Sequence, residues 1–198
     1  MPLVTLLTIA SLAGATPAPM RPFAPVAVDT ACQVLHPKTT PAEGRKSPLD
    51  SLTFQVAQQP VKLCYGRPSS RGRVMIGGEN VPFGKLWRTG ANEPTIFFTP
   101  VPITVAGIKV PPGKYSLYTV PGAKEWQVIV NRSTSQWGEE SNYTPAVKAQ
   151  EVGRGTVPVE QVKTPIETFT IRAAPGAGGA GLVLEWERTR IRIPIAQA

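Results

Sequence analysis

Apolar and polar residues alternate along several short stretches of this chain, and this is the pattern of half-buried β-strands. Leu52, Phe54 and Val56 are separated by single polar residues, and the same period of two recurs in residues 61–65 and 101–105. Because successive side chains of a strand point to opposite faces, each stretch presents one apolar face to a core.

Turn-forming residues separate these stretches. The V-P-P-G of residues 110–113 precedes a strand expected over 115–120, and the P-G-A-K of residues 121–124 leads into another over 125–130. Proline and glycine at these places favour tight turns, so the four segments predict a hairpin.

A second hairpin is expected near the C-terminus. Strands over residues 166–171 and 182–187 flank the glycine-rich loop 175–179, a last strand covers 191–195, and the one short helix falls around 145–150. The pattern predicts an all-β chain, with a single antiparallel β-sandwich or barrel-like domain of about nine to eleven short strands.

The N-terminal part of the chain has a different character. Residues 1–15 contain an apolar run that ends in Ala13-Gly14-Ala15, as in a signal peptide, although no Lys or Arg precedes the run. Residues 16–48 are rich in Pro and Ala and predict a flexible lead-in, and residues 49–198 form the β-rich domain. No other apolar run is long enough for a transmembrane segment. We therefore expect export to the periplasm or the cell exterior.

The chain has two cysteines, Cys32 in the lead-in and Cys64 in a strand-like run. In an exported protein they suit a disulfide that ties the lead-in to the domain. Equally, Cys64 suits a small buried side chain and Cys32 a surface thiol. The absence of a C-x-x-C motif argues against redox catalysis.

The net charge of the chain limits the classes of partner that are expected. The formal net charge is +8 and the pI is about 9.8, and a basic surface favours acidic polysaccharides, anionic lipid headgroups or small anions. Nucleic acid is not expected, because the chain lacks zinc-finger spacing, a helical basic region and an RNA-binding signature.

The sequence lacks the residue combinations that form a hydrolase triad, a zinc site or a phosphate-binding loop. The single histidine, His36, lies in the lead-in and provides neither a triad base nor a zinc site, so we expect no metal and no cofactor. Residues 72–78 are glycine-rich but lack the ending of a phosphate-binding loop. Glu185 and Glu187 alternate along one strand and are expected on a solvated face with Arg188 or Arg190.

The segment of residues 65–93 concentrates cations, turn formers and aromatic residues, and it contains only two acids. Loops of this composition are more often functional than strands are. Trp126 and Trp186 lie in strands and are expected in the core, whereas Trp137 lies in a loop. The candidate ligand-binding residues are Arg67, Arg73, Lys85, Trp87, Arg88, Asn92, Glu93 and Trp137.

Three interpretations of this segment remain open. In the first and favoured one, the protein is a binding module for an anionic or hydroxyl-rich envelope ligand, such as a small acid or a glycan. In the second it is a hydrolase or isomerase, with Glu93 as general base and Arg88 and Lys85 stabilising an oxyanion. In the third, Arg88 and Glu93 brace the loop and the protein acts through protein contacts.

Three motifs together resemble a known family. They are Y-G-R-P-S-S-R-G-R-V-M-I-G-G followed by V-P-F-G-K-L-W-R-T-G-A-N-E-P-T, then G-I-K-V-P-P-G-K-Y-S-L-Y-T-V-P, and W-Q-V-I-V-N-R before Q-W-G. From about Ser47 to Ile195 the chain is similar to the exported bacterial family catalogued as domain of unknown function 2911. The resemblance implies a compact, β-rich, exported domain and carries no catalytic assignment. The chain departs from the family pattern at Cys64 and at Arg71.

Overall fold

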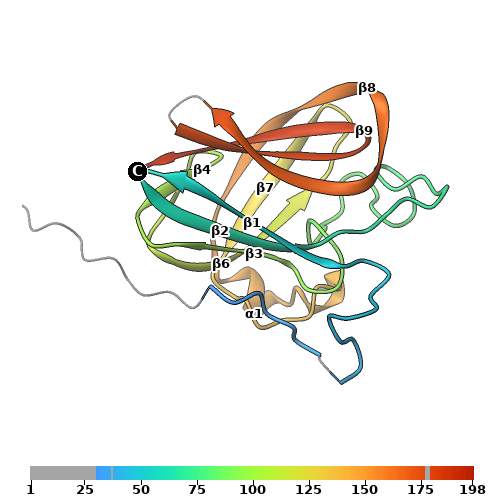
Figure 1. Ribbon diagram of the computed structural model, residues 1–198, viewed down its shortest axis with the longest axis horizontal. Coiled ribbons are helices and arrows are strands. Elements are labelled where there is room, and N and C mark those ends of the chain that lie inside the picture. The colour runs from blue at the N-terminus through green and yellow to red at the C-terminus, as the bar shows by residue number, and fades with distance from the viewer. Residues whose placement is uncertain (1–29, 37, 177–178) are drawn as a thin grey trace, which may run out of the picture.

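The structure is a computed structural model that describes residues 30–36, 38–176 and 179–198 (Figure 1). Within these ranges the chain forms nine strands and two short helices. The strands are β1 (Leu49–Val56), β2 (Gln59–Gly66), β3 (Thr95–Thr99), β4 (Ile103–Val105), β5 (Ile108–Val110), β6 (Gly113–Val120), β7 (Glu125–Asn131), β8 (Glu151–Gly176) and β9 (Gly179–Gln197). The helices are the 3-10 helix η1 (Glu140–Asn142) and α1 (Pro145–Lys148), and α1 lies where the sequence predicts a helix.

All nine strands belong to one antiparallel sheet with the order β1-β2-β3-β6-β7-β8-β9-β4-β5. The sheet is not closed into a barrel, because the edge strands β1 and β5 do not pair with each other. In Figure 1 the β8–β9 hairpin lies above β1 and β2, and β1 contacts both β8 and β9, so the sheet folds over itself as in a sandwich. The prediction of a single antiparallel all-β domain is confirmed.

The two faces of β2 are both covered. Val61, Leu63 and Tyr65 point into the main core, as their alternation predicts. Cys64, on the opposite face, is also buried and forms a second small apolar cluster with Ile96 and Phe98 of β3, against which Cys32 packs. The face that the alternation assigns to solvent is therefore covered by the lead-in.

Aromatic side chains fill the centre of the main core. Trp126 and Trp186 are each 2% exposed, which confirms their predicted core positions. The ring of Trp87 lies 5.9 Å from each of theirs and 5.0 Å from the ring of Phe169. Large buried aromatic side chains contribute strongly to a core of this size. In this protein the four rings join β7, β8 and β9 to the long connection between β2 and β3, which carries Trp87.

The tyrosines give a measurable signature of this packing. All four tyrosines of the chain have a raised phenol pKa, chiefly because burial disfavours the phenolate, and burial raises the pKa of Tyr118 to about 12. An unfolded tyrosine ionises near pH 10, so above about pH 10 the folded chain holds more protons than the unfolded chain. The tyrosines thus favour folding below about pH 10, and this contribution is lost as the pH rises further.

We therefore expect little tyrosinate absorbance from the native protein at about pH 10, where the protein in guanidinium chloride is about half ionised. A spectrophotometric pH titration of both states checks this prediction. A native midpoint equal to the unfolded one would contradict it.

The lead-in is anchored to the domain over its described part. The signal peptide expected over residues 1–15 lies outside the described residues, as do residues 16–29 of the lead-in. Residues 30–36 and 38–48 run along the outside of the domain (Figure 1), where Cys32 is bonded to Cys64 of β2. The disulfide that the sequence left open is formed. It attaches the lead-in to the sheet, so this part of the lead-in is not a free spacer.

None of the helices in the described ranges is long and apolar enough to cross a membrane.

Candidate functional site

The segment of residues 65–93 comprises the end of β2 and nearly all of the connection to β3. Its glycines permit close backbone contacts: a Cβ atom at Gly66 would lie 2.1 Å from the carbonyl oxygen of Ala91. Only glycine fits at such a distance. The second part of the segment is thereby packed against the end of β2.

Trp87 lies inside the protein. The backbone N–H of Trp87 donates to the carbonyl oxygen of Thr119 in β6 at 2.7 Å. The backbone N–H of Thr119 donates to the carbonyl oxygen of Trp87 at 2.9 Å. The side chain is 4% exposed and lies within the aromatic core. Trp87 was predicted to contact a ligand, but this position makes it a core residue, because the surrounding rings leave no open face.

Glu93 is buried and fully engaged. Its Oε2 lies 2.7 Å from Nη1 of Arg45, and its Oε1 accepts from Nη2 of Arg45 and from the N–H of Leu35, each at 3.0 Å. The side chains of Arg45 and Glu93 are only 3% and 5% exposed. A general base at Glu93 would first have to release Arg45. The partner of Glu93 is therefore a lead-in arginine, not Arg88 as the bracing interpretation assumes.

Arg88 and Asn92 support neighbouring loops. Arg88 forms an ion pair with Glu140 of η1 at 3.2 Å, and Asn92 donates from Nδ2 to the carbonyl oxygen of Ser47 at 3.2 Å. Nearby, the half-buried ring of Trp137 lies 4.8 Å from the ring of His36. These contacts join the lead-in and the loop after β7 to the residues that precede β3.

Arg67 also has a structural role. It pairs with Asp50 of β1 at 3.3 Å and donates to Thr170 of β8 at 3.2 Å. This places it between two strands that are not neighbours in the sheet.

Lys85 is exposed beside a hollow of about 450 Å³ that Glu79 and Glu140 also line. Its ammonium group forms no ion pair with a described residue.

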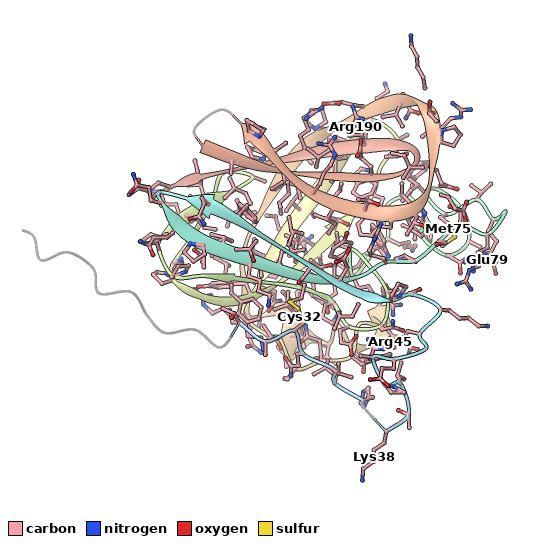
Figure 2. All side chains as sticks on the ribbon, viewed as in Figure 1. Cys32, Lys38, Arg45, Met75, Glu79 and Arg190 are labelled. Atoms are coloured by element: carbon pink, nitrogen blue, oxygen red, sulfur yellow. A yellow bond between two sulfur atoms is a disulfide. The ribbon has the colours of Figure 1, made fainter. Side chains whose placement is uncertain are left out.

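The predicted site residues therefore do not form one site, although Arg88, Asn92 and Glu93 lie close to the loop after β7. Glu93 pairs with Arg45 of the lead-in. Met75 and Glu79, which belong to the outer loop of residues 70–86, lie at the end of the molecule away from the C-terminus (Figures 1 and 2). Of the predicted cations, Lys85 lines the hollow described above, and Arg73 lines a second, larger cavity.

That cavity has a volume of about 570 Å³ and is formed by residues 70–76, 165–167 and 187–189. It lies where the outer loop meets a bend of the β8–β9 hairpin. The bend is created by an irregular strand register after Gln161 and by a left-handed backbone at Glu187, with φ of 53°. We call this 570 Å³ space the arginine cavity, after Arg73 and Arg188, which line it.

Two carboxylates in its wall hold the outer loop in place. Glu187 accepts from the N–H groups of Met75 and Ile76 at 2.9 and 2.8 Å, and Glu167 accepts from the N–H of Arg71 at 2.7 Å. The prediction of a solvated strand face was therefore wrong for both Glu185 and Glu187. Its partner on that strand, Glu185, is buried and pairs with Arg172 and with the predicted Arg190.

The two arginines of the cavity are held by backbone groups. Arg73 donates to the carbonyl oxygens of Ser70 and Ser69 at 3.0 and 3.1 Å, and Arg188 donates to the carbonyl oxygen of Lys163. Neither guanidinium forms an ion pair with a described residue. Their charges remain available to a ligand, in an orientation that the carbonyl bonds define.

Sequence reasoning missed Arg188 as a site residue. It was considered only as a partner for Glu185 or Glu187, because it lies more than a hundred residues from Arg73. A usable signal was the run of alternating arginines at 188, 190 and 192, which has more positive charge than the neighbouring acids require.

Comparison with known proteins places the chain in a family. The model of the family described as Protein of unknown function (DUF2911) matches residues 47–195. The chain belongs to this family. No curated protein and no solved structure is similar to it.

The DUF2911 match divides the features described above into two groups. The arginine cavity and the outer loop lie entirely inside the matched range. Cys32 and Arg45, which attach the lead-in, lie before it. In this DUF2911 protein, therefore, the carboxylate of Glu93 belongs to the family domain and its buried partner belongs to a segment that precedes the domain.

Proposed function

We propose that this protein is an exported binding module for a small anionic ligand that carries hydroxyl groups, held in the arginine cavity. The observation that carries the proposal is the pair of guanidinium groups, Arg73 and Arg188, that line one cavity without ion-pair partners among the described residues. Guanidinium groups bind carboxylates and phosphates through paired hydrogen bonds.

The remaining lining explains why the ligand should carry hydroxyl groups. One oxygen of Glu167 accepts from the loop backbone, and the other accepts from no described residue, so it can accept from a ligand hydroxyl. Thr189 adds a hydroxyl that can donate or accept. A cavity with both cationic and carboxylate walls suits a polyhydroxy acid, such as a sugar acid, better than a bare anion.

The size of the cavity agrees with this class of ligand. Its volume of about 570 Å³ lies within the range of small-molecule sites, roughly 300–1,000 Å³. The wall is also held in a fixed shape, because Glu187 and Glu167 bind the loop backbone on one side. A fixed wall reduces the ordering that binding requires.

The proposed location outside the cytoplasm rests on two features. The apolar run before residue 15 has the character of a signal peptide. The disulfide between Cys32 and Cys64 is of a kind that persists in oxidising compartments.

The test is isothermal titration of the protein with glucuronate, with inorganic phosphate, and with neutral glucose as the uncharged comparison. We expect glucuronate to bind and glucose to bind much more weakly. Because hydrogen bonds to charged groups contribute about 1.5–3 kcal/mol each, Arg73→Ala and Arg188→Ala should each weaken glucuronate binding by about tenfold or more.

Arg132→Ala is the matched control, since Arg132 is exposed, lies after β7 and does not line the cavity. It removes the same charge and should leave glucuronate binding unchanged. Equal losses in all three variants would indicate general electrostatic attraction, and no binding of either acid by a folded wild-type protein would refute the proposal.

A further inference from the structure

The outer loop ends in an apolar surface. Val74 is 70% exposed and Phe83 is 47% exposed. Among the described residues, these are the two large hydrophobic side chains that are exposed to solvent. Both lie against the same turn of the loop: a Cβ on Gly77 would be 2.6 Å from the Phe83 ring, and one on Gly78 would be 3.3 Å from Cγ1 of Val74. We call these two side chains and the loop that carries them, residues 70–86, the tip.

The tip is held rigidly. Ile76 forms a bridge with Val81, and the N–H of Gly77 donates to the carbonyl oxygen of Val81 at 2.9 Å. Met75 is buried at the base of the loop, and its N–H is bound by Glu187 of β9. The apolar side chains are thus presented by an anchored loop, and their exposure does not come from a lack of local structure.

Cations surround the apolar side chains. The tip carries Arg71, Arg73 and Lys85 and a single acid, Glu79, and in the described structure none of these four side chains takes part in an ion pair. Figure 2 shows Met75 and Glu79 at one end of the molecule, where the loop extends beyond the strands. The tip is therefore both apolar and net positive, and it projects outward.

We propose that the tip docks on the surface of an anionic lipid bilayer. Apolar side chains that project from a rigid loop can enter the boundary between headgroups and acyl chains, while Arg and Lys contact lipid phosphates. A small soluble anion would use the cations but leave Val74 and Phe83 in water, and a bilayer takes up both. The tip and the arginine cavity share Arg73 and Val74, but Phe83 and Lys85 do not line the cavity, so these two side chains distinguish the docking surface from the proposed function.

The experiment is co-sedimentation of the full protein with vesicles of phosphatidylcholine that contain phosphatidylglycerol, and with vesicles of phosphatidylcholine alone. We expect sedimentation with the anionic vesicles only, and weaker sedimentation at high salt, because salt screens exposed charges. Binding to neither kind of vesicle, or to both equally, would overturn the proposal.

Two variants test which side chains carry the binding. Phe83→Ser should weaken the apparent vesicle affinity by about tenfold, since a buried aromatic side chain is lost from the interface. Lys85→Ala should weaken it by about fivefold, as expected for one cation near an anionic surface. Lys109→Ala, an exposed lysine on the edge strand β5, is the matched control and should bind as wild type does.

Val74→Ser provides a second apolar variant in case Phe83→Ser does not fold.

Analytical ultracentrifugation tests whether a second copy of the protein, and not lipid, covers the tip. A wild-type dimer that Phe83→Ser converts to monomer would show that a second copy covers the tip, and would overturn the proposal.

Competition separates this inference from the proposed function. Saturating glucuronate should not release the protein from anionic vesicles. If it does release the protein, the arginine cavity and not the tip holds the lipid headgroup, and the docking proposal falls. If vesicles do not bind but glucuronate does, the docking proposal falls and the arginine cavity stands.

Discussion

Glu93→Gln is expected to lower the free energy of unfolding by about 3–5 kcal/mol, because it leaves the guanidinium group of Arg45 buried without a counter-charge. The side chains of Arg45 and Glu93 are almost completely enclosed and share two hydrogen bonds, at 2.7 and 3.0 Å. Glutamine can accept from the guanidinium group but cannot neutralise it. Chemical denaturation monitored by tryptophan fluorescence measures the loss.

A double-mutant cycle identifies the pair as the cause. Arg45→Met should cost a similar amount, because it leaves the carboxylate of Glu93 buried. The combined Arg45→Met/Glu93→Gln variant should lose much less than the sum of the two single changes, since neither charge remains. Additive losses would show that the two residues do not interact.

Glu140→Gln is the matched control. It changes the same side chain in an exposed ion pair, with Arg88 20% and Glu140 41% exposed, so it should cost less than about 1 kcal/mol. If Glu93→Gln were as mild as Glu140→Gln, the lead-in would not be docked in solution, and Glu93 would again be free for the general-base role.

Removing the disulfide is expected to have the second-largest effect. Cys32→Ser with Cys64→Ser should destabilise the protein by about 3–4 kcal/mol in the chain-entropy description, because the bond closes a loop with a sequence separation of 32. Lys114 binds Gln33 and Glu93 binds Leu35 in the same region, so the loss should also weaken these contacts. Denaturation of the double variant gives the value.

Reduction of the wild-type protein provides the comparison for this prediction. Wild type in dithiothreitol should unfold like the double variant, and the double variant should not respond to dithiothreitol. If the double variant were as stable as oxidised wild type, the bond would not constrain the unfolded chain, and the lead-in would be attached only through residues such as Arg45.

The sequence predicts the strands whose two faces differ in polarity. β1 and β2 follow from the alternation of their apolar residues, and β6 and β7 follow from the turn between them. β3 was missed because Thr95–Thr99 is buried on both faces, so no alternation marks it. A period of two appears only where one face is covered and the other is open.

The first half of β8 was missed for a different reason. Gly153, Gly155 and Pro158 suggest a loop, yet they lie in a continuous strand paired with β7. The glycines are needed because β8 passes close to another part of the chain: a Cβ at Gly155 would lie 2.2 Å from the carbonyl oxygen of Ala106. A glycine in a strand can mark such an approach, and the approaching segment is distant in sequence.

By itself, the sequence determined the fold class, most strand positions, the core tryptophans in strands and the family, because these depend on local alternation and on contiguous motifs. Only the tertiary structure decided which charges meet. It paired Glu93 with Arg45 of the lead-in, buried Trp87, and placed Arg188 of β9 in the wall of the cavity that Arg73 also lines. The physical reason is that charge pairing and cavity formation depend on distances across the folded sheet, and residue order along the chain does not contain those distances.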